Sequence, residues 1–315
     1  VQKRLFKAFS VSDFQKCFLL QKLILGSNFA RLLAIRQVTQ LSPYKKVPGI
    51  DGKMFLTFTE RFELNEILRL NYSNWYSKLF RVVSILKKDG TLQLIRLPVI
   101  PDRVWQLIVS YSIEPVYECF FHPHSFGFRS SYGIFDLQEF IYLNFSISSN
   151  PEQKRVLLLD LEKVFQNFNP DFLLTNLIAP RGVKLGLFRA FNGGFIPDFP
   201  SESVSDLNLS SLLANIVLNE INSIHSSARF GFNVVFILKP SDDEKVIFSR
   251  VLTFLHLHNL SSSVKVPGLF SLLEGFNFLD WSYIYSLEKG LLITPSFDNY
   301  QRFLFRVKRV LNNSN

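Results

Sequence analysis

Only a few side chains in this 315-residue sequence have types and spacings that could do chemistry. Cys119, His122 and His124 bring one thiol and two imidazoles together in the stretch CFFHPHSF. A structural zinc site needs four such ligands, usually as two closely spaced pairs, and this stretch holds only part of one set. The five histidines of the chain also form no defensible catalytic triad. We therefore expect neither a zinc site nor triad chemistry.

Carboxylates near strand ends are the other candidates, because hard divalent cations prefer oxygen ligands. Asp160 ends the apolar run VLLLD, which is typical of a buried strand. Asp242 and Asp243 follow a second apolar run, but they begin a helical pattern with Ser241 as predicted N-cap and Glu244 at the reciprocal capping position. Capping and the helix dipole explain this pair, and a lone Asp160 is more often a turn or cap residue than a ligand.

The elements that must position these residues mix helices and strands without an internal repeat. Two β-branched runs flanking KKDGT predict one hairpin, and RFGFNVVFIL predicts another, with its bend at Gly-Phe-Asn. Apolar residues at helical spacing predict helices over 12–38 with a break at Gly26 and Ser27, 60–72, 102–121, 132–145 and 209–226. This irregular order predicts an α+β fold built around an antiparallel sheet.

The composition favours a folded chain with a polyanionic partner. Apolar residues make up 47% of the sequence, and 35 lysines and arginines against 26 acidic residues give a net charge of +9. Nucleic acid is therefore the first expected partner and an anionic membrane surface the second, while a basic protein with neither partner stays open. No run of eighteen apolar residues exists, so we expect no membrane span.

Residue usage also bears on the compartment. Only Cys17 and Cys119 are present, without a disulfide pattern, which indicates a reducing interior or no redox role. Phe occurs 34 times and Met once, a usage that would follow from a strongly A/T-rich genome. We therefore expect an organelle protein, mitochondrial or chloroplast, encoded by the organelle itself.

Four stretches, in order, resemble the reverse transcriptase domain of group II intron-encoded proteins, the maturases. VTQLSPYKKVPGIDGK is similar to the N-terminal segment of that family, and FRVVSILKKDGTLQLIRLPVIPDRVWQ to its fingers hairpin and the following Asp-Arg-x-x-Gln block. IEPVYECFFHPHSFGFRSSYG resembles the Ser-x-Gly-Phe-Arg run, and LSSLLANIVLNEI the Leu-Ser-Pro-Leu-Leu-Ala-Asn helix. Their order and separations agree over roughly residues 30 to 300.

The resemblance implies a right-hand fold. It places a basic helical N-terminal extension over 1–55, a fingers-like region over 56–155, a palm-like region over 156–294 and the start of a thumb-like helix over 295–315. GFNFLDWSYI resembles the family's Phe-Leu-Gly strand, and TPSFDNYQRFLFRVKRV its first thumb helix. We expect most of the thumb, the X domain and any endonuclease domain to be absent from this chain; a separate chain could supply them.

The polymerase motif of this family does not carry over. Nucleotidyl transfer needs two divalent metals held by carboxylates, and the family supplies them from one palm-strand Asp and the pair in Tyr/Phe-Ala-Asp-Asp. Asp160 matches the first carboxylate and Phe165 the aromatic residue after it. RFGFNVVF, however, aligns Phe232 and Asn233 with the Asp pair. A phenyl ring cannot bind Mg²⁺ and an amide binds it weakly, so we expect no catalytic residue, metal, cofactor or enzymatic activity.

Two further departures agree with this prediction. The family's Pro-Gln-Gly is replaced by VSD at 204–206, and its Gly-Lys-x-Arg-Pro by GTLQL at 90–94, which removes two cations suited to a triphosphate. These changes affect the template-strand and nucleotide elements of a polymerase. We therefore rank an active reverse transcriptase below the two non-enzymatic alternatives, a splicing cofactor and a structural subunit of a ribonucleoprotein.

The features that could hold RNA are retained. Aromatic residues Tyr44, Trp75, Tyr76 and Phe80 could stack on unpaired bases, although at least two of the four should be core residues. Cations contact phosphates without reading sequence. Our candidate RNA-binding residues are Lys45, Lys46, Lys87, Lys88, Arg103, Arg129, Arg302, Arg306, Lys308 and Arg309.

The sequence thus predicts a catalytically inactive, RNA-binding, maturase-type cofactor for group II intron splicing. The alternative is a structural subunit of a larger organellar ribonucleoprotein, such as a ribosome or an RNA-processing complex. Both imply structured RNA, intron or ribosomal, and further protein subunits as partners. The subunit should co-purify stoichiometrically, whereas loss of a splicing cofactor should cause unspliced transcripts to accumulate.

Overall fold

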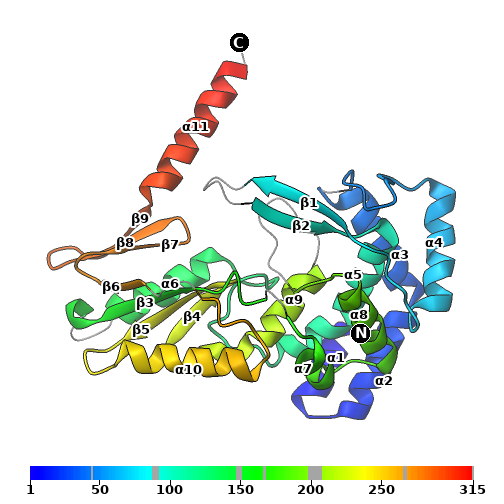
Figure 1. Ribbon diagram of the computed structural model, residues 1–315, viewed down its shortest axis with the longest axis horizontal. Coiled ribbons are helices and arrows are strands. Elements are labelled where there is room, and N and C mark those ends of the chain that lie inside the picture. The colour runs from blue at the N-terminus through cyan, green and yellow to red at the C-terminus, as the bar shows by residue number, and fades with distance from the viewer. Residues whose placement is uncertain are drawn as a thin grey trace. The chain divides into compact units, whose positions relative to one another are not determined.

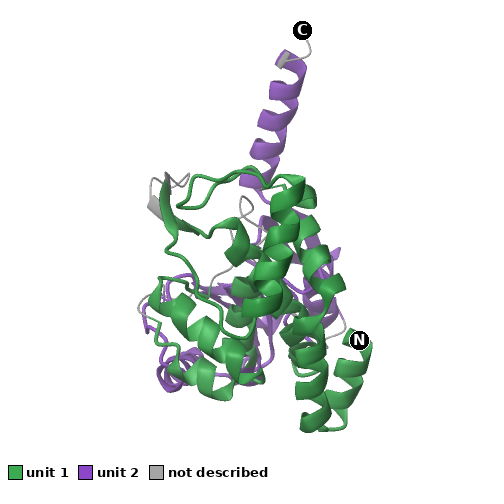
Figure 2. Ribbon diagram, turned by 90° about the vertical axis from the view of Figure 1, so that its right-hand side faces the viewer, with its two compact units in different colours: residues 1–121, 167–219 green, residues 122–166, 220–315 purple. Residues whose placement is uncertain are grey.

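The computed structural model describes residues 1–43, 45–86, 92–146, 151–165, 168–197, 208–264 and 268–313. The chain forms two compact units, one from Val1–Phe121 and Asn167–Asn219, the other from His122–Gln166 and Glu220–Asn315 (Figure 2). Helices and strands are mixed, which confirms the predicted α+β class. The right-hand arrangement and the division into extension, fingers, palm and thumb stay predictions.

The first unit is mainly helical and contains one two-stranded hairpin (Figure 1). The hairpin pairs β1 (Arg81–Leu86) with β2 (Leu92–Leu97) in antiparallel register, as the runs around KKDGT predict; the turn, 87–91, lies outside the described residues. The helices are α1 (Gln2–Ser10), α2 (Phe14–Gly26), α3 (Asn28–Arg36), the π-helical turn η1 (Gln37–Leu41), α4 (Phe58–Asn71), α5 (Ile100–Glu118), α7 (Asp171–Asn176), α8 (Arg181–Asn192) and α9 (Asn208–Val217).

Local sequence explains where the N-terminal helices of this unit begin. The predicted break between α2 and α3 is confirmed, and Ser27 caps α3 by accepting a hydrogen bond from the Ala30 amide at 3.4 Å. Helix α4 begins after a capping box, in which the Thr57 hydroxyl accepts from the Glu60 amide and the Glu60 carboxylate accepts from the Thr57 amide at 2.7 Å. These caps satisfy amides that a helix start otherwise leaves unpaired.

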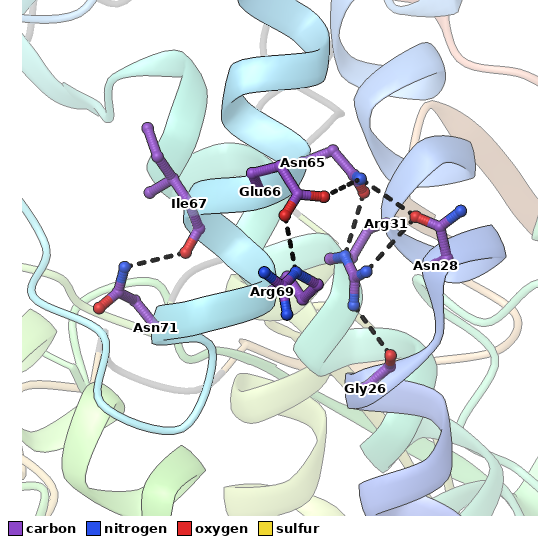
Figure 3. Close-up of polar contacts among 8 residues, drawn as sticks. All are labelled: Gly26, Asn28, Arg31, Asn65, Glu66, Ile67, Arg69 and Asn71. Atoms are coloured by element: carbon purple, nitrogen blue, oxygen red, sulfur yellow. Dashed lines mark hydrogen bonds and ion pairs between the residues drawn. The ribbon is translucent and has the colours of Figure 1, made fainter.

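A buried arginine joins α3 to α4 (Figure 3). Arg31 Nε donates to Asn65 Oδ1 at 3.0 Å, and its Nη1 donates to the Gly26 carbonyl at 2.8 Å. Burial lowers the pKa of Arg31. This cation is therefore part of the helical core and does not belong to the basic surface that the N-terminal sequence suggests.

The second unit is built on an antiparallel four-stranded sheet with the order β4-β5-β3-β6. Helix α6 packs on this sheet, and its Leu137, Ile141 and Phe145 share a core with strand residues such as Val156 and Val235. The strands are β3 (Arg155–Asp160), β4 (Ser227–Phe230), β5 (Asn233–Leu238), β6 (Gly268–Ser271) and, in a second sheet, β7 (Phe276–Phe278), β8 (Trp281–Ser286) and β9 (Gly290–Pro295). The helical segments are α6 (Ile134–Ser146), η2 (Pro151–Gln153), η3 (Asn219–Ser223), α10 (Glu244–Leu257) and α11 (Phe297–Asn313).

The predicted cap of α10 is wrong by two residues. Ser241 lies in a turn, and the N-cap is Asp243, whose carboxylate accepts from the Lys245 amide at 2.9 Å. Asp242 instead stabilises the turn after β5, because its Oδ2 accepts from the Lys239 amide at 2.7 Å. Both aspartates thus serve the local backbone, as their position before a helix indicates.

One property of the helices concerns membranes. In the parts of the chain that the structure describes, no single helix is both long and apolar enough to cross a membrane. Helix α2 and the segment Asn28–Leu41 meet that criterion only when taken together, and they are bent by 57° where they meet.

Candidate functional site

The β4–β5 hairpin places Gly231 and Phe232 at its tip. Phe230 pairs with Asn233 across the two strands, which leaves a two-residue turn. Gly231 has a φ of +61°, and glycine at the first position of such a turn adopts this conformation without strain. The bend that the sequence predicts in RFGFNVVFIL is therefore confirmed.

Phe232 turns this tip into a packed, apolar corner. Its side chain is only 9% exposed, and its ring centroid lies 6.0 Å from that of Phe165 at an interplanar angle of 51°. The Phe232 carbonyl also accepts a hydrogen bond from the Leu161 amide at 3.0 Å. The tip is thus fixed to the segment that follows β3 by both side-chain packing and backbone hydrogen bonding.

Asp160 lies beside this corner and pairs with Asn233 in the β3–β5 register. Its Oδ1 accepts a hydrogen bond from the Glu162 amide at 2.9 Å, so the carboxylate stabilises the turn after β3. The residues at the tip therefore offer one carboxylate, one neutral amide and one phenyl ring.

This donor set does not fit a two-metal centre. Mg²⁺ takes six oxygen ligands in near-octahedral geometry and is usually anchored by carboxylates, whereas the buried ring of Phe232 offers no donor atom. Among the residues that the structure describes, no group of three or more His, Cys, Asp or Glu side chains is arranged to hold a metal ion.

The SFGFR run supports the same tip from its other side. Ser125 and Arg229 form a parallel β-bridge; the Phe126 amide donates to the Arg229 carbonyl at 2.9 Å, and the Arg229 amide donates to the His124 carbonyl at 2.9 Å. Gly127 approaches the tip so closely that a Cβ there would lie 2.2 Å from the Gly231 nitrogen. The run thus acts as an additional edge segment of the sheet.

Arg229 holds the hairpin from inside, a role that was not predicted from the sequence. Its fully buried guanidinium donates to Ser125 Oγ at 2.7 Å, the Gly231 carbonyl at 3.0 Å and Asn222 Oδ1 at 3.4 Å. Burial, and to a smaller extent the charge of Arg129, lowers the pKa of Arg229 to about 9. The available signal was an arginine at the start of the apolar run RFGFNVVFIL, because a guanidinium that folding buries must be surrounded by oxygen atoms.

His122 and His124 lie in the same part of the unit. Their ring centroids are 5.2 Å apart, and His124 packs against Phe140 at 4.3 Å. Burial is the main cause that lowers the pKa of each imidazole, so both are mainly neutral near pH 7. They belong to the packing around the SFGFR run.

The predicted RNA-binding cations fall into different environments, beginning with those of the first unit. Lys45 and Lys46 are exposed, and Lys45 Nζ donates to the Gln40 carbonyl at 2.9 Å. Arg103 is buried, and its guanidinium donates to the Pro98 carbonyl at 2.9 Å and the Val47 carbonyl at 2.7 Å. We therefore assign Arg103 to the fold and leave it out of the proposed RNA contacts. Lys87 and Lys88 lie outside the described residues.

The predicted RNA-binding cations of the second unit also include both buried and exposed residues. Arg129 is buried; its Nη1 donates to the Ser125 carbonyl at 2.6 Å, and its guanidinium lies 4.4 Å from the Tyr132 ring centroid. Arg302 pairs with Asp280. Arg306, Lys308 and Arg309 are exposed on α11. Because Arg129 serves the fold in the same way as Arg103, we also leave it out of the proposed RNA contacts.

The aromatic residues predicted to stack on bases also include both buried and exposed side chains. Trp75 and Phe80 are buried, which confirms that at least two of the four are core residues. Tyr76 is 67% exposed. Tyr44 lies outside the described residues.

Asp102 is a buried residue whose role the sequence analysis missed. Its two carboxylate oxygens accept hydrogen bonds from Trp75 Nε1 at 2.8 Å and from the Lys78 amide at 3.0 Å. Burial raises the pKa of Asp102 to about 6, although both hydrogen bonds oppose the shift. In the sequence, Asp102 is marked only by its place beside Arg103 in the Asp-Arg block. That position does not distinguish a structural carboxylate from one that faces RNA.

This environment predicts a pH-dependent stability of the first unit. The pKa of Asp102 rises from 3.8 to about 6 on folding, so the folded state binds the extra proton, and stability falls as pH rises through this window, by on the order of 3 kcal/mol. Asp102→Asn should remove this dependence and leave one buried donor without an acceptor, which costs about 1 to 3 kcal/mol.

Urea unfolding followed by the fluorescence of Trp75 and Trp105 checks this expectation. Trp281→Phe serves as the background, so that emission reports only the first unit. Asp171→Asn, at an exposed carboxylate in the same unit, is the matched control and should leave the pH dependence unchanged. An equal pH dependence in the Asp102→Asn variant would contradict the assignment.

Comparisons with known proteins agree with the resemblance in the sequence. The family described as the N-terminal domain of reverse transcriptase matches residues 1–68. The chain is 43% identical to Maturase-like protein 1 of Euglena gracilis, over 100% of this chain and 69% of that protein. Identity to Maturase-like protein 1 of Euglena longa is also 43%, over 100% of this chain and 70% of that protein. Protein YkfC of Escherichia coli is 27% identical over 59% of this chain and 52% of its own length.

Proposed function

Because this chain belongs to the group II intron maturase and reverse-transcriptase-like family, we propose that it is an RNA-binding, maturase-type protein that assists group II intron splicing without polymerising DNA. The observation that carries the second half of this proposal is the hairpin tip. Phe232 is packed against Phe165 where a polymerase requires a carboxylate, and Asp160 stabilises a turn. A protein with this tip is left with the family's capacity to hold RNA.

The distribution of charge supports the RNA-binding half. The chain carries a net charge of +9, and exposed cations remain in each unit: Lys45 and Lys46 in the first, Arg306, Lys308 and Arg309 in the second. Such cations contribute affinity by releasing counterions from RNA phosphates. We propose an organelle as the compartment, which rests on the phenylalanine-rich usage of the chain and on its Euglena relatives.

Binding of a group II intron transcript at several salt concentrations tests the RNA contacts. Lys45→Ala with Lys46→Ala should weaken binding and lower the slope of log affinity against log salt by about two, because each phosphate contact contributes about one. Lys245→Ala with Lys289→Ala, at exposed lysines of the second unit, is the matched control. An equal loss from both pairs would show that only net charge matters and would contradict a specific contact at Lys45 and Lys46.

Primer extension tests the missing activity. The purified chain should yield no product on an RNA template with Mg²⁺ or Mn²⁺, and any product that depends on Asp160 would sink the proposal. Sequencing of RNA crosslinked to the protein in its organelle tests the partner. Reads concentrated on introns support a splicing cofactor, whereas reads on ribosomal RNA would replace it with a structural ribonucleoprotein subunit.

A further inference from the structure

A half-buried arginine and an exposed tyrosine are stacked on each other in the first unit. Arg189, on α8, places its guanidinium carbon 3.5 Å from the ring centroid of Tyr76. Tyr76 is nevertheless 67% exposed, so most of the residue stays accessible to solvent. A large aromatic surface is thus presented beside a fixed cation.

Hydrogen bonds fix the arginine in this position. Its Nη1 donates to Asn74 Oδ1 at 2.8 Å and to the Trp75 carbonyl at 3.1 Å. Both bonds use a single nitrogen of a guanidinium that carries five N–H donors. Arg189 is therefore oriented by the residues next to Tyr76, through only part of its donor capacity.

The segment that carries Tyr76 is itself held rigidly. The neighbouring Trp75 is buried, donates from Nε1 to Asp102 at 2.8 Å and stacks on Trp105 with ring centroids 6.1 Å apart at 9°. Helix α8 packs directly on the same segment, since a Cβ at Gly182 would lie 2.4 Å from the Ser73 carbonyl oxygen. Tyr76 thus faces solvent from a stiff support beside the half-buried Arg189, and little ordering would be needed when a ligand binds.

The two segments that carry the pair are cationic. Residues 72–81 and helix α8 contain no acidic residue. Lys78, Arg81 and Arg181 are exposed on these two segments. The charged side chains that these two segments could offer to a phosphate are therefore all cationic.

We propose that Tyr76 and Arg189 form a preformed stacking site for an unpaired base of bound RNA, with Lys78 as a contact for a neighbouring phosphate. The proposal rests on the RNA-binding function above and names the part of the RNA that the site accepts. Aromatic rings and guanidinium planes both stack on bases, whereas the bases of a duplex are already stacked on each other. The site should therefore accept loops, bulges and single strands.

Fluorescence anisotropy with a short oligoadenylate, an oligouridylate and an RNA duplex of the same length tests the site. Tyr76→Ala should weaken binding of the single strands by about 5- to 100-fold, and Tyr76→Phe should retain binding within about twofold. The affinity for the duplex should stay within about twofold in both variants. Tyr142→Ala is the matched control, because Tyr142 is a half-exposed tyrosine on α6 of the other unit.

Arg189→Lys separates stacking from simple charge. Lysine keeps the positive charge and loses the planar group, so single-strand affinity should fall by about fivefold or more if the guanidinium stacks. Oligonucleotides that contain 4-thiouridine should also crosslink to the peptide that contains Tyr76. Thermal unfolding identifies any variant that is destabilised, and Tyr76→Leu then keeps an apolar contact with Arg189 while removing the aromatic ring.

Several outcomes would overturn the site. Unchanged single-strand affinity in folded Tyr76→Ala or Tyr76→Leu, an equal loss for the duplex, or crosslinks confined to other peptides would each do so. These outcomes are distinct from failure of the proposed function, in which the unaltered protein would not bind intron RNA at all. If the unaltered protein binds intron RNA and the Tyr76 variants bind it equally well, only the stacking site is refuted.

Discussion

Replacing Phe232 with aspartate should destabilise the second unit by about 3 to 5 kcal/mol. The substitution places a carboxylate where the resemblance aligns one of the polymerase motif, yet this tip is packed around an apolar ring. The phenyl ring is packed against Phe165 and only 9% exposed. Aspartate would remove that packing and bring a second carboxylate next to Asp160, whose register partner is the neighbouring residue Asn233.

The loss of stability should depend on pH with a defined sign. Burial and the neighbouring carboxylate would raise the pKa of the introduced carboxyl above that of the unfolded chain. The folded variant then binds an extra proton, so the deficit relative to the unaltered protein should be smaller near about pH 5 and larger near about pH 8. Thermal unfolding monitored by circular dichroism at both values measures this difference.

Two control variants separate the effect of the site from that of the residue type. Phe232→Leu keeps an apolar side chain at the tip and should cost less than about 1.5 kcal/mol. Phe135→Asp makes the same chemical change at an exposed position of α6 in the same unit and should change stability by less than about 0.5 kcal/mol. If Phe232→Asp were as mild as Phe135→Asp, the tip would still tolerate a carboxylate, and the argument against a metal centre would lose its main support.

The effect of Mg²⁺ on stability tests whether the tip can still bind a metal ion. The variant that combines Phe232→Asp with Asn233→Asp adds two carboxylates, which with Asp160 make the three of the family motif. If the tip kept a metal-binding geometry, Mg²⁺ would raise the unfolding midpoint of this variant and leave that of the unaltered protein unchanged, because a ligand stabilises the state that binds it. We expect no such recovery, since the surrounding packing is adapted to a ring.

Gly127→Ala should be the second large effect, destabilising the second unit by about 3 kcal/mol or more. The added Cβ would lie 2.2 Å from the Gly231 nitrogen and 2.9 Å from the Phe230 carbonyl carbon, and both are backbone atoms. A flexible side chain could move away from such a contact. Here the SFGFR run or the hairpin tip must shift as a whole, which would strain the hydrogen bonds between Arg229 and residues 124–126.

Limited proteolysis and thermal unfolding measure the consequence. Gly133→Ala, six residues further along the chain, is the matched control, because its Cβ would meet nothing nearer than an Asp136 oxygen at 3.8 Å. The Gly127 variant should be cleaved faster around residues 124–130 and unfold at a lower temperature, and the Gly133 variant should resemble the unaltered protein. Equal stability of the two variants would mean that the run and the tip are not in close contact.

Local sequence patterns were sufficient for most elements that form the site. The pairing of the strands on either side of KKDGT, the break at Gly26 and Ser27, the strand that ends in Asp160 and the Gly-Phe-Asn bend are each confirmed. Each depends on turn chemistry or on the apolar period of a short segment. The cap of α10 was misplaced because Ser241 and Asp243 are both good caps. Only the turn after β5 decides where the helix can begin.

The arginines could not be assigned from sequence alone. Arg31, Arg103, Arg129 and Arg229 count equally toward the net charge, and each donates to protein oxygen atoms, most of them backbone carbonyls, that only the folded chain brings into reach. A residue-type argument places all of them on a basic surface. Tyr76 was a stacking candidate from its residue type, but the sequence could not show that it lies against Arg189, 113 positions later in the sequence.

The pairing between Ser125 and Arg229 also has a consequence for self-association. Strand β4 is an edge of the four-stranded sheet, and an open edge presents unpaired amide and carbonyl groups to strands of other molecules. The amide and the carbonyl of Arg229 are already used by His124 and Phe126. The segment that contains SFGFR therefore hinders the addition of another strand next to Arg229. A variant that releases this segment should aggregate even where its helices remain folded.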